Sequence, residues 1–231
     1  MKIGILQAGH YPDALQAAHG DYDTMFQDFL DGHGFSFEVF PVVDMVFPAG
    51  PDAADGWLIT GSRHGVYEDL PFIAPLEDLV RRIDAARLPL IGICFGHQII
   101  AQALGGEVIK YPGGWAVGRT EYRTGDGRTF TLNAWHQDQV VRRPARARLE
   151  ATSAFCENAV LRYDTPIWTI QPHPEFGAAH VTGLAETRGR GLIPDALLDS
   201  AVAHADAGTD RRAIGAQMAD FFLSARTRAE A

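Results

Sequence analysis

The sequence is poor in cysteine, with only two in 231 residues, Cys94 and Cys156. Two cysteines are too few for a disulfide framework, and their scarcity fits a chain that works in a reducing cytosol. Basic residues are also scarce, because 20 Lys and Arg stand against 29 Asp and Glu, which gives a formal net charge of −9. This charge argues against nucleic acid as the main partner.

Long apolar runs, internal repeats and low-complexity tracts are missing as well. No stretch approaches the roughly 20 residues of a membrane-spanning helix, and the N-terminus lacks the apolar core and cleavage site of a signal peptide. We therefore expect a cytoplasmic protein with no membrane partner. Hydrophobic residues nevertheless make up 46% of the chain, which is ample for the core of one α/β domain with appendages.

What the first half of the chain does contain is short buried strands that alternate with helices. We expect strands at residues 2–6, 35–43, 56–60 and 89–93, a helix that Asp23 or Thr24 caps, and a helix over residues 76–86. Such alternation predicts a parallel sheet with helices on both faces. Residues 7–23 are expected to form a long loop, and loops of that length are often lids or binding loops.

The second half is expected to add antiparallel strands to this sheet. Two apolar runs, residues 159–163 and 167–171, flank Asp164-Thr165-Pro166, which is a clear hairpin signal. A helix is expected from Arg211 to Ala225, whereas residues 188–208 show no pattern that places them.

One stretch organises the chain, an apolar run over residues 90–93 that stops at Cys94. Gly92 and Gly96 flank the cysteine, and a helix-periodic stretch follows. A nucleophile between a strand and a helix is the arrangement of the G-x-S-x-G elbow, with sulfur in place of oxygen. The helix N-terminus favours a thiolate. The alternative is a buried structural cysteine.

A catalytic cysteine needs a base and a group that orients the base. Residues 170–176, Ile-Gln-Pro-His-Pro-Glu-Phe, offer both at the end of an expected strand, as His173 and Glu175. Two positions apart in extended backbone, these side chains lean to the same side. Taken alone, His173 could equally be a surface histidine.

These two motifs together resemble the class I, triad-type glutamine amidotransferase family. The resemblance rests on Gly-Ile-Cys-Phe-Gly-His-Gln at 92–98, Gly105-Gly106 and Gln-Pro-His-Pro-Glu at 171–175. It is strongest to stand-alone proteins similar to the amidotransferase half of GMP synthase. It implies a flavodoxin-like open sheet and covers residues 2–186. We therefore expect an amidotransferase domain at 1–187 and a C-terminal helical extension at 188–231 packed on it.

The resemblance also implies roles for single residues. Cys94 attacks the side-chain amide carbon of glutamine, His173 moves the proton to the leaving ammonia, and Glu175 holds the imidazole. Water then hydrolyses the γ-glutamyl thioester. The oxyanion hole takes the backbone N–H of Phe95 and one from the loop at Gly61, where glycine lets the backbone approach closely.

The same resemblance places the substrate-binding residues. They are Ser62 and Gln98, together with Trp135, His136, Gln137 and Asp138. Many relatives carry a small residue followed by His-Gly-Asp at the last four positions, so the Trp-His-Gln-Asp sequence indicates a different pocket rim. Pro172 also departs from the phenylalanine that GMP synthases often carry before His-Pro-Glu. The alternative interpretation of His136 is a core or hairpin histidine with no role in binding.

Two further groups of residues carry weaker signals. His10, His19 and His64 could hold a metal ion, but no HExxH or CxxC spacing accompanies them. We therefore expect no metal and no cofactor. A basic cluster favours a solvated face, with partner docking as the alternative; its members are Arg142, Arg143, Arg146 and Arg148.

Three functions stay open at this point. The chain has no GxxxxGK[ST] or Ser-Gly-Gly-x-Asp loop for ATP, so it could be a glutaminase subunit that serves a separate ammonia-accepting synthetase. It could instead be a stand-alone γ-glutamyl peptidase or hydrolase acting on γ-glutamyl peptides or amines. The third hypothesis is a catalytically silent binding or regulatory protein. The presence of Cys94, His173 and Glu175 together argues against it.

Overall fold

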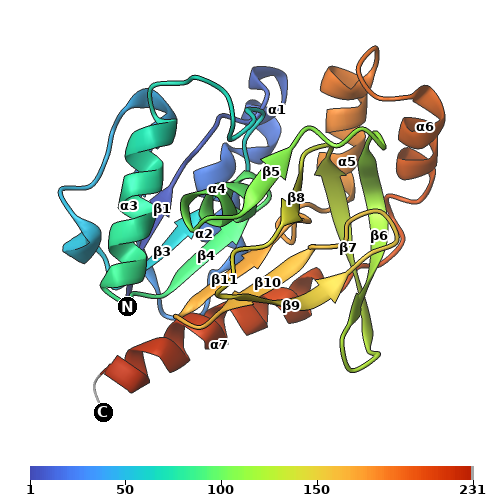
Figure 1. The fold of residues 1–231 in the computed structure, drawn as a ribbon. Coiled ribbons are helices and arrows are strands. Elements are labelled where there is room, and N and C mark those ends of the chain that lie inside the picture. Colours follow the sequence, from blue (N-terminus) through green and yellow to red (C-terminus); the bar gives the residue numbers. More distant parts are fainter. Residues whose placement is uncertain (230–231) are drawn as a thin grey trace.

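A nine-stranded sheet runs through the protein in the computed structural model, which describes residues 1–229, with side chains as far as residue 225 (Figure 1). Its strand order is β2-β1-β3-β4-β11-β10-β9-β6-β7, and a separate pair, β5-β8, lies beside it. The strands are β1 (Lys2–Leu6), β2 (Ser36–Phe40), β3 (Gly56–Ile59), β4 (Leu90–Ile93), β5 (Glu107–Ile109), β6 (Ala116–Thr124), β7 (Thr129–His136), β8 (Gln139–Arg142), β9 (Ala147–Thr152), β10 (Val160–Tyr163) and β11 (Ile167–Ile170).

The first five strands of this order are parallel to their neighbours, and the last four are antiparallel. The parallel part has the order of a flavodoxin-like sheet, in which the first strand lies between the second and third. The hairpin expected at residues 159–171 is β10 and β11, and it joins the two parts. The expected fold class, a mixed α/β sheet with antiparallel strands added in the second half, is confirmed.

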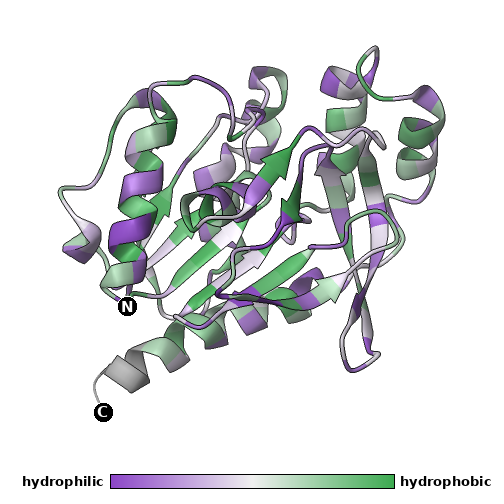
Figure 2. Cartoon of the chain, in the orientation of Figure 1, coloured by the Kyte–Doolittle hydropathy of each residue, from purple (hydrophilic) through white to green (hydrophobic). Residues whose placement is uncertain are grey.

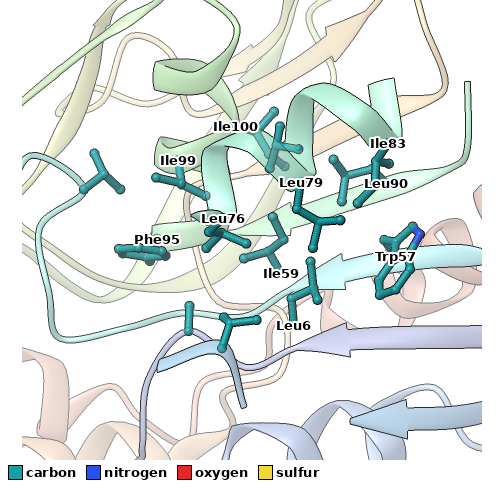
Figure 3. Close-up of a cluster of buried hydrophobic side chains, with 14 of the residues drawn as sticks. Leu6, Trp57, Ile59, Leu76, Leu79, Ile83, Leu90, Phe95, Ile99 and Ile100 are labelled. Carbon is teal, nitrogen blue, oxygen red and sulfur yellow. The ribbon is translucent and has the colours of Figure 1, made fainter. Parts of the chain in front are cut away.

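Helices cover both faces of the parallel strands (Figure 1). On one face α3 (Ile73–Ala85) and α4 (Phe95–Ala103) pack on Trp57 and Ile59, as Figure 3 shows for this cluster. On the other face α2 (Tyr22–Phe29) and α7 (Arg211–Ala229) pack on Leu58. Successive residues of a strand thus face opposite cores, which is why the central strands β3 and β4 are buried and largely apolar along their whole length (Figure 2).

The segment at residues 7–23, expected to be a long loop, contains the short helix α1 (Asp13–His19). It begins after Pro12 and ends at Gly20, whose φ is 71°, but it has no buried residue. Without an apolar face it left no periodicity in the sequence. The next helix, α2, is capped by Asp21, whose carboxylate accepts the Tyr22 N–H at 2.7 Å, so Asp23 and Thr24 were wrong as caps.

The C-terminal part covers the antiparallel strands with helices (Figure 1). Helix α5 (Ala178–Leu184) runs into a π-helical turn (Ala185–Gly189), and α6 (Asp195–Ala203) follows, lying beside β6. Helix α7 then returns under the parallel sheet. The boundary expected at residue 187 falls within the π-helical turn, and the two-part division of the chain stays a prediction.

The basic cluster between residues 142 and 148 is partly engaged in internal ion pairs. Arg146 donates to Asp84 at 2.7 Å and lies 2.8 Å from Asp164, and Arg142 pairs with Glu107 at 3.4 Å. These contacts hold the antiparallel strands to α3 and β5. Across residues 1–229, no helix combines the length and apolar character that crossing a membrane requires.

Candidate active site

Cys94 lies at a sharp turn between β4 and α4. Its backbone has φ 51° and ψ −101°, a left-handed φ that non-glycine residues seldom adopt and that concentrates at functional sites. The neighbouring glycines allow the turn, because a Cβ at Gly92 would lie 2.5 Å from the Gly96 carbonyl oxygen and one at Gly96 would collide with the Ile59 carbonyl. The fold thus holds a strained cysteine at the carboxyl end of the sheet.

His173 and Glu175 follow β11, the strand beside β4. The Nδ1 atom of His173 lies 2.7 Å from Oε1 of Glu175, and both side chains are buried. The His173 N–H donates to the Asn133 carbonyl at 2.8 Å, and the imidazole stacks on Phe176 with ring centroids 4.1 Å apart. The Glu175 carboxylate and the Phe176 ring therefore fix the orientation of the imidazole, and the backbone hydrogen bond to Asn133 fixes the position of the residue.

The His173 imidazole also interacts with Cys94. Burial by itself lowers the pKa of His173, but the negative charges of Glu175 and Cys94 and their hydrogen bonds to the imidazole raise it to about 10. A histidine in this setting holds a proton next to the sulfur. Cys94, His173 and Glu175 therefore interact in series, which is the arrangement that a nucleophile, its base and an orienting acid would need.

Gly61 and Phe95, the expected oxyanion-hole residues, lie next to His173 and Cys94 respectively. Phe95 is the first residue of α4, so its N–H has no acceptor within the helix. Gly61 follows β3 and lies against the imidazole, since a Cβ there would be 2.9 Å from Cε1 of His173. Glycine at position 61 is thus required by the His173 ring, a reason that the sequence did not reveal.

A cavity of about 210 Å³ opens in front of Cys94 and His173. All six expected substrate-binding residues line it, namely Ser62, Gln98, Trp135, His136, Gln137 and Asp138. Three expected site residues lie outside its wall: Glu175 sits behind His173, Gly61 contacts its ring, and Phe95 buries its side chain in the core. The structure therefore brings the expected site residues together around one cavity.

Gln98 links two sides of this cavity. Its Nε2 donates to the Asp138 carbonyl at 3.0 Å and to Oε1 of Gln171 at 3.1 Å. Asp138 in turn accepts a hydrogen bond from the Tyr67 hydroxyl at 2.9 Å, and burial raises its pKa. These bonds connect the helix behind Cys94 with residues 135–138 and with the loop after β3.

Two histidines near the site are neutral. Burial lowers the pKa of His136 to about 4 and that of His97 to about 3. Nδ1 of His136 lies 3.2 Å from the Asp138 carbonyl, and Nδ1 of His97 lies 2.8 Å from the Thr169 hydroxyl. His136 lines the cavity and is also buried. The two interpretations of this residue, a substrate-binding residue and a core histidine, therefore both fit its position.

Several wall residues were missed by sequence reasoning. The loop after β3, expected to supply Gly61 and Ser62, also contributes Tyr67 and Glu68 among others. The remaining missed residues belong to none of the motifs; they come from the start of α2, the residue after β5, the turn before β6, the end of α5 and the segment after it, and they are Tyr22, Lys110, Trp115, Leu184, Arg188 and Leu192.

Among residues 1–229, no cluster of three or more His, Cys, Asp or Glu side chains is arranged to hold a metal ion. Two of the singled-out histidines pair with carboxylates instead. His10 lies 2.6 Å from Asp21 and 3.0 Å from Asp44, with a raised pKa from these bonds, and His64 lies 3.2 Å from Glu68. Each of these two imidazoles therefore has a carboxylate as its hydrogen-bond partner.

Comparisons with known proteins place this fold and site. The family model for class-I glutamine amidotransferases matches residues 36–181. Gamma-glutamyl peptidase 4 of Arabidopsis thaliana is 32% identical over 182 residues, covering 71% of this chain and 72% of that protein. The gamma-glutamyl-L-1-hydroxyisopropylamide hydrolase of a Pseudomonas species is 28% identical over 204 residues, covering 77% and 69%.

A solved structure described as a glutamine amido transferase from Methylobacillus flagellatus superposes with a TM-score of 0.76 at 23% identity, covering 99% of this chain and 94% of that one. This likeness shows a shared fold along nearly the whole chain. The family match covers more than half of the chain and includes the cysteine elbow and the His-Pro-Glu turn. The chain belongs to the class I glutamine amidotransferase family.

Proposed function

We propose that this protein hydrolyses the γ-glutamyl amide bond through a thioester on Cys94, with Cys94, His173 and Glu175 as its catalytic triad. One observation carries the proposal. The strained cysteine faces a buried histidine that is bonded to a buried glutamate, and cysteine and histidine share one cavity. A purely structural cysteine would need none of these partners.

In the first step, the Cys94 sulfur attacks the amide carbon of the γ-glutamyl group, and the thiol proton resides on His173. The C–N bond breaks as His173 gives that proton to the departing nitrogen, which leaves as ammonia or an amine. Glu175 keeps the imidazole in place and favours its protonated form. The product of this step is a γ-glutamyl thioester.

In the second step, His173 takes a proton from water, and the hydroxide attacks the thioester carbon. Glutamate leaves and the Cys94 thiol is restored. In both steps the backbone N–H groups at Phe95 and Gly61 would stabilise the oxyanion, and losing one such donor typically costs about 3–4 kcal/mol of barrier. No cofactor is needed for this sequence of bond changes.

Relatives favour a stand-alone hydrolase as the form of this activity. The peptidase from Arabidopsis thaliana and the hydroxyisopropylamide hydrolase both carry γ-glutamyl compounds in their names, and both match most of this chain. The family name favours a second candidate, a glutaminase subunit that passes ammonia to a separate synthetase. The cytoplasmic location expected from the sequence stays a prediction.

Steady-state hydrolysis by the purified protein tests the proposal. Glutamine and a panel of γ-glutamyl amides are assayed for glutamate release with the wild type and with Cys94→Ala. We expect turnover of γ-glutamyl amides by the wild type alone. Turnover of glutamine only in the presence of a co-purifying partner would favour the subunit instead, and equal turnover by Cys94→Ala would contradict the nucleophile.

A further inference from the structure

The wall of the cavity divides into two parts of different chemistry. One part is polar and holds Gln98, Asp138 and the loop after β3. The other part is supplied by the turn before β6, the end of β7, the last residue of α5 and the segment that follows α5. It consists of four apolar or aromatic side chains and one arginine: Trp115, Trp135, Leu184, Leu192 and Arg188.

This second part, from here the apolar wall, lies on the His173 side of the cavity. Leu184 packs in one cluster with Tyr22 and Phe176, and Phe176 is the ring on which His173 stacks. Arg188 follows one helical turn later. Burial raises the pKa of Tyr22, the charge of Cys94 raises the same pKa further and the positive charge of Arg188 lowers it, so both Cys94 and Arg188 lie near the Tyr22 hydroxyl. The apolar wall is therefore next to the histidine that protonates the leaving nitrogen.

Arg188 has no carboxylate partner in the described part of the chain. Two residues further on, Arg190 is paired with Asp195 at 2.8 Å and with Asp199 at 2.6 Å, whereas no ion pair involves Arg188. The acidic side chains of the cavity are engaged elsewhere, because Glu68 accepts from the Gly65 N–H at 2.9 Å and Asp138 accepts from Tyr67. Arg188 is thus a half-buried cation with no protein anion to neutralise it.

Part of the apolar surface around Arg188 is open to the cavity. Leu192 is 57% exposed at the cavity wall, and Trp115 and Trp135 are only partly buried. Partly exposed apolar side chains and a cation without an ion-pair partner in one cavity match the two ends of an amphipathic anion. A carboxylate fits Arg188 because the guanidinium donates two parallel hydrogen bonds to it.

From these contacts we infer that the apolar wall is a leaving-group subsite, and that the amine released by the enzyme carries both an apolar side chain and a carboxylate. The inference deepens the proposed function, on which it rests. The departing nitrogen must lie beside His173, so its substituent extends along the apolar wall toward Arg188. The substrates that fit are γ-glutamyl amino acids with an apolar residue after the γ-glutamyl bond.

A matched pair of substrates tests this subsite. γ-Glutamyl-leucine and γ-glutamyl-isoamylamide differ only in the carboxylate of the leaving group. We expect the wild type to prefer γ-glutamyl-leucine in kcat/KM by roughly tenfold to a hundredfold, the worth of a charge-assisted hydrogen bond. In Arg188→Met this ratio falls to about one, and Arg188→Lys restores part of it.

Arg212→Met is the control, because Arg212 is exposed on α7 outside this cavity, and it should keep the wild-type ratio. Equal turnover of both compounds by the wild type would overturn the subsite while leaving the γ-glutamyl hydrolase intact. A wild-type preference that Arg188→Met does not change would also overturn it. No turnover of either compound by a wild type that hydrolyses another γ-glutamyl amide would overturn the subsite alone, whereas no turnover of any γ-glutamyl amide would overturn the proposed function and the subsite with it.

Discussion

The imidazole of His173 rests against the α-carbon of Gly61, so closely that a methyl group there would lie 2.9 Å from Cε1. The contact joins two loops that follow different strands, β3 and β11. The side chain at position 61 therefore sets how near His173 can come to the end of β3. The same residue supplies the loop N–H expected to bind the oxyanion.

Gly61→Ala tests this contact. The added methyl displaces the His173 ring, and a shift of about 1 Å in a catalytic group can cost about 100-fold in rate. We expect kcat for γ-glutamyl amides to fall by about that factor, while the thermal midpoint changes by only a few degrees. Turnover and thermal unfolding of the same preparation give both values.

Gly125→Ala serves as the control for a glycine-to-alanine change. Position 125 lies in the β6–β7 hairpin, has no atom within 4 Å of an added Cβ and is not among the glycines with positive φ. It should keep wild-type turnover. Full activity in Gly61→Ala would show that the His173 ring can move away from the added methyl group without loss of function, and would contradict the proposed role of this contact.

The parallel half of the fold was predictable from the sequence because its signals are local. Strands such as β3 and β4 are buried on both faces and read as short apolar runs, and the Gly-Ile-Cys-Phe-Gly pattern marks the elbow without knowledge of the partner strands. His173 and Glu175 were found for the same reason, since two prolines and a strand end surround them. Taken alone, His173 could still have been a surface histidine, and only its combination with the Cys94 elbow singled out all three residues.

The rest of the site depends on contacts between distant segments. Arg188 and Leu192 come from a π-helical turn and the residues after it, where no apolar periodicity exists to mark an element. Trp115 lies before a β-strand that pairs with β7, and only this pairing brings it beside Trp135. The sequence also does not show which charged residues form ion pairs. Arg188 and Arg190 look alike in the sequence, and only the structure shows that Arg190 is paired with Asp195 and Asp199.

Glu175→Gln should lower the pKa of His173. The carboxylate charge is one of the causes that raise this pKa to about 10 despite burial, and glutamine keeps the shape but removes the charge. We expect the His173 ring in the wild type to stay protonated through neutral pH, and in Glu175→Gln to lose its proton at lower pH. NMR titration of isotope-labelled histidine measures this directly.

The same shift predicts how stability depends on pH. Because the folded pKa of His173 exceeds the unfolded value of about 6.5, the folded state binds the proton more tightly. This contribution is fully present below pH 6.5 and is lost as the pH rises toward 10. The free energy of unfolding should decline more steeply over this range in the wild type than in Glu175→Gln. Glu121→Gln, an exposed change on β6, should follow the wild type; identical slopes in all three would contradict the role of Glu175.

Arg211 is expected to act as a positioning residue for the His-Pro-Glu turn. At the start of α7, its guanidinium donates to the Pro174 carbonyl at 3.2 Å and to the Glu175 carbonyl at 2.8 Å. Arg211→Met removes both bonds, each worth about 1.5–3 kcal/mol when one partner is charged, so we expect lower kcat with little change in KM. Arg211→Lys should recover part of kcat, and a variant that raised KM alone would point to substrate binding instead.

Selective alkylation separates the two cysteines. Burial raises the pKa of Cys156 to about 12, so its thiol should stay unreactive at neutral pH. Iodoacetamide is expected to label Cys94 once and abolish turnover, and a γ-glutamyl substrate should slow this labelling. Cys156→Ala should keep both the labelling and the activity. Loss of activity through modification of Cys156 would contradict this assignment.

Trapping the acyl-enzyme tests the central claim most directly. The protein is mixed with γ-glutamyl-leucine, quenched in acid during turnover and examined by intact and peptide mass spectrometry. The account predicts a mass increase of one glutamyl acyl group on the peptide that contains Cys94, absent from Cys94→Ala and sensitive to hydroxylamine. Turnover with no acyl group on Cys94, or an acyl group on another residue, would contradict it.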